Sequence, residues 1–146
     1  MKRTKFRLFL ASALTFLWLC VIWGNSLLPG SQSSQVSGWV GELLEKILPF
    51  LNMGADSAML ILRKLGHFSE FAVLGVLLTW FCGMLKSRLF TPILCGIAVA
   101  CADETIQLFV PGRHGCVTDV LIDSAGVITG VLLLLLIRKC RKTGCK

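Results

Sequence analysis

The sequence predicts an all-α integral membrane protein with four transmembrane helices and an interfacial amphipathic helix outside the cytoplasm. Three observations predict this class: 55% of the residues are hydrophobic and only 16% are charged, four apolar segments are long, and basic residues flank those segments. A soluble domain usually carries about 25% charged residues, so the composition excludes a water-soluble globule. The net charge of +7 does not lie on a polar surface, so we expect no nucleic-acid partner.

The four apolar segments set the expected membrane spans. A hydrocarbon core of about 30 Å requires roughly 20 mostly apolar residues in a helix. The second helix can begin as early as Asp56, a possible N-cap. The basic N-terminus resembles that of a signal peptide, but no small-residue cleavage site follows closely, so we expect an uncleaved first span. We expect residues 1–146 to form one membrane domain with spans at about 6–24, 65–85, 89–110 and 118–137.

The distribution of charge predicts the orientation. With both termini in the cytoplasm, eleven of the fifteen basic residues lie on the cytoplasmic side, as the positive-inside rule requires. The acidic residues all fall on the outer side or in the outer ends of the spans. The basic residues placed inside are Lys2, Arg3, Lys5, Arg7, Lys86, Arg88, Arg138, Lys139, Arg141, Lys142 and Lys146.

The long connection over residues 25–62 is expected on the outer side. It begins as a loop rich in Ser, Gly and Pro. From Trp39 to Leu51, apolar residues then recur at helical spacing, with Glu42 and Glu45 on the other face. This segment is too short to span the membrane, and it predicts either an interfacial helix on the outer leaflet or a helix that covers the mouth of the bundle.

Ionisable residues inside the spans are costly and normally face the interior of a helix bundle. Their spacing of three and four residues places them on one face of each helix, and their depths are similar. We therefore expect one acidic and basic pocket that opens to the outside. The predicted pocket residues are Arg63, His67, Glu70, Asp103, Glu104, Gln107, Arg113, Asp119 and Asp123.

Plainer interpretations apply to the same residues. The polar groups can form a structural network between helices, and Asp119 can serve as the N-cap of the last helix. Gly126 and Gly130 form a pair four residues apart that is typical of close helix packing. His67 and the neighbouring carboxylates offer metal ligands, but two arginines would compete for those carboxylates, so we expect no metal and no cofactor.

Three ordered polar motifs resemble the VanZ-like family. The resemblance covers most of residues 20–135, and it includes the segment Asn25-Ser-Leu-Leu-Pro-Gly, which is similar to the family's serine-bearing first loop. The motifs are Arg63-Lys-x-x-His67-x-x-Glu70-Phe, Asp103-Glu-x-x-Gln107-x-Phe-x-Pro111-Gly-Arg113 and Asp119-Val-x-x-Asp123-x-x-Gly126.

The resemblance implies a small multi-span membrane protein, and the family's namesake raises tolerance to teicoplanin. It implies no reaction and no catalytic residue. We therefore expect a non-enzymatic envelope protein that contacts membrane lipids and binds a lipoglycopeptide or a lipid-linked cell-wall intermediate. The alternative is a membrane-embedded enzyme that acts on a polyprenyl or teichoic-acid lipid, with His67, Glu70 and Glu104 as candidate acids or bases. A proton-coupled carrier is disfavoured because no charge lies in the cytoplasmic half of any span, and the sequence does not set the oligomeric state.

Overall fold

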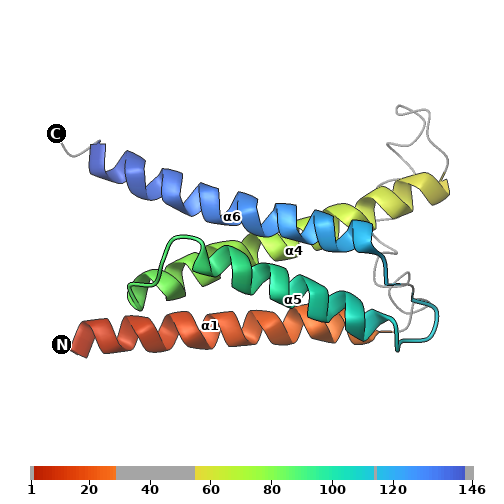
Figure 1. Ribbon diagram of the computed structural model, residues 1–146, viewed down its shortest axis with the longest axis horizontal. Helices are drawn as coiled ribbons and strands as arrows, with labels where there is room; N and C mark the ends of the chain where they lie inside the picture. The colour runs from red at the N-terminus through yellow and green to blue at the C-terminus, as the bar shows by residue number, and fades with distance from the viewer. Residues whose placement is uncertain (1, 29–54, 114, 144–146) are drawn as a thin grey trace.

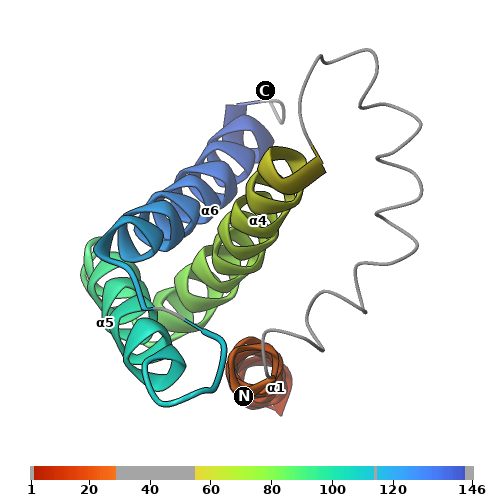
Figure 2. The same cartoon turned by 90° about the vertical axis from the view of Figure 1, so that its right-hand side faces the viewer.

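Four helices, and no strands, make up the part of the chain that this computed structural model describes, residues 2–28, 55–113 and 115–143. The helices run side by side (Figure 1), and α4 contacts each of the other three. Seen from one end, α6 and α4 form a closely packed pair, with α5 and α1 beside them (Figure 2). The helices are α1 (Lys2–Leu27), α4 (Ala55–Met84), α5 (Thr91–Gln107) and α6 (Val117–Thr143).

Three of these helices are long and apolar enough to cross a membrane. The qualifying segments are Thr4–Leu27, Leu60–Met84 and Val117–Thr143. At 1.5 Å per residue, the 17 residues of α5 extend about 25 Å, which is shorter than a typical hydrocarbon core. Four helices are therefore present in the described residues, and three meet the length of a span.

The bundle buries a narrow core and exposes apolar side chains around its outside. Phe71, Leu74 and Val127 are fully buried at the centre. Phe9 and Phe16 are each 69% exposed, although both are large and apolar. A water-soluble helix bundle would bury such residues, whereas a hydrocarbon environment accommodates them at no cost.

Close packing of α4 against α6 depends on two glycines. A Cβ atom at Gly126 would overlap the carbonyl oxygen of Phe68, and one at Gly130 would overlap that of Ala72. The absence of side chains lets the two backbones approach directly, as small residues do in membrane helix pairs. This approach brings the polar faces of α4 and α6 together.

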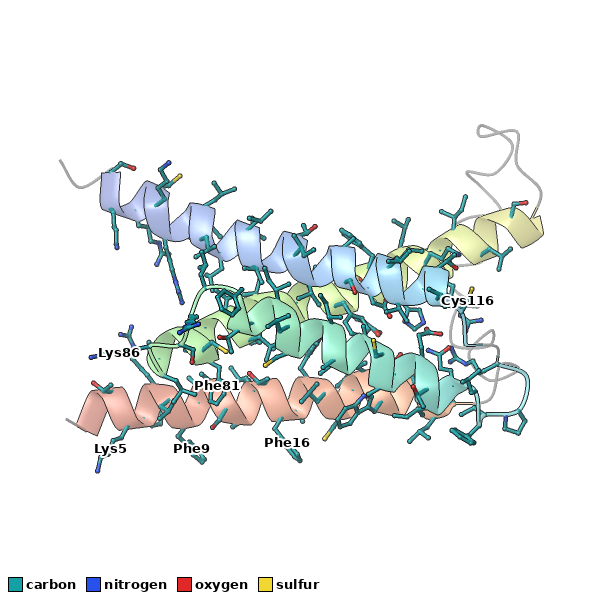
Figure 3. All side chains as sticks on the ribbon, viewed as in Figure 1. Lys5, Phe9, Phe16, Phe81, Lys86 and Cys116 are labelled. Carbon is teal, nitrogen blue, oxygen red and sulfur yellow. The ribbon has the colours of Figure 1, made fainter. Side chains whose placement is uncertain are left out.

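The two ends of the bundle differ in charge. One end carries both chain termini and the turn between α4 and α5, with Lys5 and Lys86 projecting from it (Figures 1 and 3). The opposite end carries the end of α1, the start of α4 and the connection from α5 to α6, with Cys116 nearby (Figure 3). The acidic side chains described below all lie in the half next to this second end.

The helices differ from the predicted spans at their boundaries. The predicted connection over 25–62 is helical at both ends, because α1 continues to Leu27 and α4 already begins at Ala55. The predicted span over 89–110 is shorter, because Pro92 stands in the first turn of α5 and a turn follows Gln107. Gly112 has φ 74° in that turn, a left-handed conformation that glycine adopts without strain. The amphipathic helix predicted near 39–51 lies outside the described residues.

Candidate functional site

The polar residues of three helices meet near the end of the bundle opposite the termini. They come from the first half of α4, the last turns of α5 and the first turns of α6, and the end of α1 adds two more. The structure brings together His67, Asp103 and Asp123 most closely, since each offers one potential ligand atom and these atoms lie within 4.8 Å of one another. We call these three residues the buried triad.

Asp103 anchors the network that joins α1, α4 and α5. Ser26 donates its hydroxyl hydrogen to Asp103 Oδ2 at 2.8 Å, and Gln107 donates from Nε2 to the same oxygen at 3.0 Å. Arg63 reaches the Oε1 atom of Gln107 at 3.4 Å. Because the amide of Gln107 is held on both sides, the orientation of the Asp103 carboxylate is fixed.

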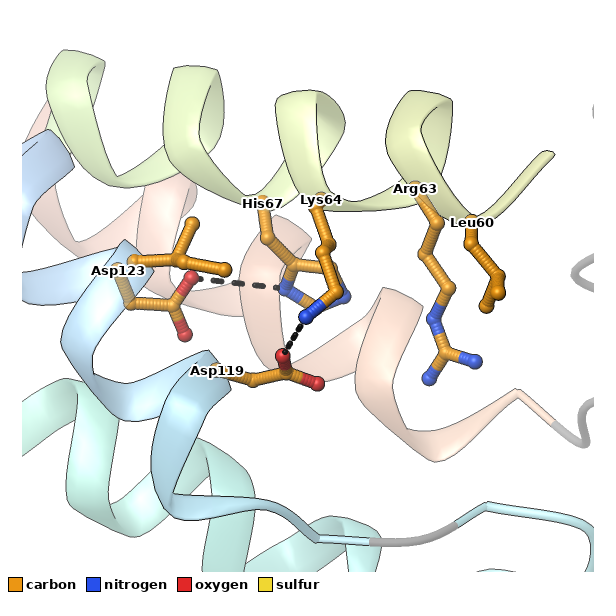
Figure 4. Close-up of a pocket in the computed structure, with 7 residues that line it drawn as sticks. Leu60, Arg63, Lys64, His67, Asp119 and Asp123 are labelled. Atoms are coloured by element: carbon orange, nitrogen blue, oxygen red, sulfur yellow. Dashed lines mark hydrogen bonds and ion pairs between the residues drawn. The ribbon is translucent and has the colours of Figure 1, made fainter. Parts of the chain in front are cut away.

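His67 and Asp123 lie deeper, where α4 and α6 face each other. Nδ1 of His67 is 3.9 Å from Oδ1 of Asp123, which is beyond hydrogen-bonding distance (Figure 4). Asp123 is fully buried, and neither of its carboxylate oxygens has a hydrogen-bond partner among the described residues. Asp103 Oδ1 and His67 Nδ1 are likewise buried without a partner within that part of the chain.

A small open pocket of about 50 Å³ lies between α4 and α6 above these groups. Lys64 and Asp119 form an ion pair of 3.0 Å at its rim, and both side chains are partly exposed (Figure 4). Such a pair contributes only about 0–1 kcal/mol to stability, so it can open at little cost. The residues that line the pocket are Leu60, Arg63, Lys64, His67, Asp119, Ile122 and Asp123.

Glu70 and Glu104 do not line this pocket. Asn25 donates from Nδ2 to Glu70 Oε1 at 2.8 Å, while the backbone N–H of Cys116 donates to Glu104 Oε2 at 2.8 Å. The first contact ties α1 to α4, and the second holds the start of α6 against α5. The structure therefore gives both glutamates a role in joining helices.

Arg113 occupies a different position from the one predicted. Its Nε donates to the carbonyl oxygen of Leu28 at 3.2 Å, and its Nη2 donates to that of Asn25 at 2.9 Å. These contacts satisfy carbonyl groups at the C-terminal end of α1, where a positive charge is favourable. In the part of the chain that the structure describes, neither Arg113 nor Arg63 forms an ion pair with a carboxylate. The expected competition between arginines and a metal ion for the carboxylates is thus not observed.

Three contributors to the site were not predicted as site residues. Asn25 and Ser26 supply side-chain donors to Glu70 and Asp103, and Trp18 donates from Nε1 to the carbonyl oxygen of Glu70 at 2.9 Å. The family resemblance includes the segment that begins at Asn25, but its Ser, Gly and Pro content predicts a loop and no site residue. No sequence pattern in the first span distinguishes Trp18 from the apolar residues around it.

Comparison with known proteins identifies a family for this chain. A family model described as VanZ/LLP1 matches residues 11–138. The matched region contains α4 and α5 entirely, α1 without residues 2–10 and α6 without residues 139–143, together with every residue of the site. No curated protein and no solved structure matches the chain significantly.

Proposed function

The chain belongs to the VanZ/LLP1 family, and we propose that it is a multi-pass cell-envelope protein whose polar end binds an anionic amphiphile and thereby contributes to teicoplanin tolerance. The amphiphile is a lipoglycopeptide or a lipid-linked cell-wall intermediate. Membership of the family suggests a role in glycopeptide resistance, and the pocket between α4 and α6 supplies a place where that role can be exercised.

The proposed topology has four membrane-crossing helices and both termini in the cytoplasm. It is supported by the difference between the two ends of the bundle, since the end with the termini carries most of the basic residues of the described chain. Lys and Arg favour the cytoplasmic side of a membrane. In this orientation α5 crosses the membrane with a shorter apolar segment than the other helices do. The pocket then opens to the outside.

The single observation that carries the binding proposal is the composition of the pocket. Arg63 and Lys64 place two cationic groups in its lining, where the rim pair of Lys64 with Asp119 can open, while Leu60 and Ile122 add apolar surface beside them. Guanidinium and ammonium groups bind phosphate and carboxylate, and the adjoining apolar surface suits an acyl or polyprenyl chain. An amphiphile with an anionic head therefore matches the pocket better than a purely polar or a purely apolar molecule.

One observation favours an enzyme as the second candidate. His67 and Asp123 lie in the wall of the pocket with buried nitrogen and oxygen atoms that have no described partner. Such groups can take up or release a proton next to a bound lipid phosphate. Turnover of a polyprenyl phosphate or teichoic-acid intermediate by the purified protein would favour this candidate over simple binding.

The experiment that tests the binding proposal uses the purified chain in lipid nanodiscs. Binding of teicoplanin, of vancomycin, which lacks the acyl tail, and of a polyprenyl phosphate is measured separately, so that the drug and the lipid are distinguished. We expect the double variant Arg63→Gln/Lys64→Gln to weaken binding of the true ligand about tenfold or more, since each charged contact contributes about 1.5–3 kcal/mol.

Lys142→Gln serves as the matched control because it removes one charge at the other end of the bundle. It should leave binding unchanged. If the double variant binds every probe as well as the unmodified chain does, the pocket is not the binding site.

A further inference from the structure

The buried triad contains several buried polar atoms that have no hydrogen-bond partner among the described residues. Asp123 is fully buried and both of its oxygens lack a described partner, as do Oδ1 of Asp103 and Nδ1 of His67. Removing carboxylates from water without a hydrogen bond or a counter-charge costs several kcal/mol. One potential ligand atom of each residue lies within 4.8 Å of those of the other two, where α4, α5 and α6 meet.

We propose that His67, Asp103 and Asp123 bind a divalent transition-metal ion of the manganese or zinc class. One imidazole nitrogen and two carboxylates are a ligand set that these ions accept. Two ionised carboxylates carry the charge that a divalent cation neutralises, whereas the neighbouring arginines of the described chain are directed elsewhere.

The spacing of the ligand atoms fits this assignment. The distance of 3.9 Å between His67 Nδ1 and Asp123 Oδ1 is too long for a hydrogen bond. Two ligands that bind one ion at about 2.1 Å lie roughly 3.4 Å apart in a tetrahedral arrangement. They lie about 4.2 Å apart when they are on opposite sides of an octahedrally coordinated ion. The largest separation in the triad is within 4.8 Å, so side-chain rotations of about an ångström bring all three atoms to one ion.

The surroundings of Asp103 support the same assignment. Its Oδ2 atom accepts hydrogen bonds from Ser26 and Gln107, and its Oδ1 atom is buried without a partner among the described residues. Metal ligands are commonly oriented in this way, by partners that hold one oxygen of the carboxylate and leave the other for the ion.

The metal also gives the pocket a specific chemistry. The triad lies beside the pocket that Arg63 and Lys64 border, and His67 and Asp123 belong to both. An ion with three protein ligands keeps an open coordination position, which a phosphate or carboxylate oxygen of a bound molecule can fill. The proposal does not rest on the glycopeptide role, because metal content is measured without any drug or lipid ligand.

The experiment measures metal binding by the full-length chain in detergent after treatment with a chelator and desalting. Mn²⁺ is the first probe, because it prefers oxygen and nitrogen ligands over the thiolates of the seven cysteines. We expect about one Mn²⁺ per chain by elemental analysis, an altered Mn²⁺ electron paramagnetic resonance signal and a raised unfolding temperature. Zn²⁺ should displace the Mn²⁺, and Mg²⁺ should bind more weakly.

Two variants remove ligands and one serves as a control. Asp123→Asn and His67→Gln should each weaken Mn²⁺ binding at least tenfold, while Asp119→Asn, one turn away on the same helix, should retain it. Size-exclusion chromatography identifies any variant that fails to fold, and Asp103→Glu then replaces it as the test, with a changed resonance signal expected.

Two outcomes would overturn the proposal. One is that the folded, unmodified chain binds no Mn²⁺ or Zn²⁺ in a saturable, near-stoichiometric way. The other is that the triad variants bind the ions as tightly as Asp119→Asn does.

Discussion

Ser26 near the end of α1 donates a hydrogen bond of 2.8 Å to Asp103 of α5, and both side chains are buried. The two residues are 77 positions apart in the sequence. Because Gln107 donates to the same carboxylate oxygen, the contact forms part of a network that Arg63 extends to α4. The first helix is therefore joined to the site by specific hydrogen bonds as well as by apolar packing.

The hydrogen bond between Ser26 and Asp103 should contribute measurably to stability. Replacing Ser26 by Ala removes one of two donors to a buried carboxylate oxygen, so we expect a loss of about 1.5–3 kcal/mol in the free energy of unfolding. Unfolding of the purified chain in detergent measures this loss. Ser12→Ala is the matched control on the same helix, because the Ser12 hydroxyl is exposed and its one bond among the described residues is to the carbonyl oxygen of Phe9 in α1. An equal effect of the two substitutions would contradict the assigned contact.

The contact of α4 with α6 predicts a strong effect at one glycine. Gly130→Ala introduces a Cβ that overlaps the backbone carbonyl of Ala72, so the helices must separate. We expect a loss of about 1–3 kcal/mol, typical of an overpacked site, and a lower unfolding temperature in detergent.

Gly66→Ala is the control for this prediction, since a Cβ there meets nothing within 4 Å. It should leave stability unchanged or raise it by up to about 1 kcal/mol through helix propensity. A Gly130→Ala protein as stable as Gly66→Ala would show that α4 and α6 do not approach so closely.

The proposed orientation is tested by labelling single-cysteine variants in intact cells with a membrane-impermeant maleimide. Cys116 is exposed next to the polar end, and Cys140 is exposed near the end with the termini. We expect Cys116 to react and Cys140 to react only after the membrane is permeabilised. Labelling of Cys140 in intact cells would reverse the assigned orientation.

The reactivity of Cys116 should depend on its neighbour Thr118. A hydrogen bond with the Thr118 hydroxyl, 3.0 Å from the sulfur, lowers the pKa of the Cys116 thiol below its ordinary value. A lower pKa gives more thiolate near pH 7, and the thiolate is the form that reacts with maleimide. Thr118→Val should therefore raise the pKa and shift the labelling rate profile to higher pH. Thr143→Val, at the other end of α6, should leave the profile unchanged.

The sequence predicted the helical class and the polar faces because both follow from periodicity. Apolar segments about 20 residues long indicate helices in a membrane, and polar residues three or four apart share a helix face. His67, Asp103 and Asp123 do come within 4.8 Å of one another. These residues converge if the polar face of each helix is directed toward the interior of the bundle.

The hydrogen-bond partners of individual side chains could not be predicted from periodicity. Arg113 was expected to meet carboxylates but instead binds the carbonyl groups at the end of α1, because the last turn of a helix leaves carbonyls without partners. Glu104 was expected in the pocket but accepts from the N–H of Cys116 at the start of α6. Both outcomes depend on where helices end, and helix ends are poorly defined by periodicity.

The structure also changes which substitutions test function. Glu70, Glu104 and Arg113 join helices, so replacing them should lower the amount of folded protein, since each hydrogen bond to a charged group contributes about 1.5–3 kcal/mol. Arg63 and Lys64 border the pocket with exposed or partly exposed side chains, and the contact of Arg63 with Gln107 is long, at 3.4 Å, so replacing them should leave the fold largely intact.

The most direct test of the proposed function measures teicoplanin tolerance and membrane protein level together in a susceptible host that expresses the chain. Vancomycin is the comparison drug, and Lys142→Gln is the control variant. We predict that Arg63→Gln/Lys64→Gln reduces teicoplanin tolerance to that of cells without the protein, while its level in the membrane stays unchanged. Full tolerance in the double variant at an unchanged protein level, or loss of tolerance only in proportion to loss of protein, would contradict a functional pocket between α4 and α6.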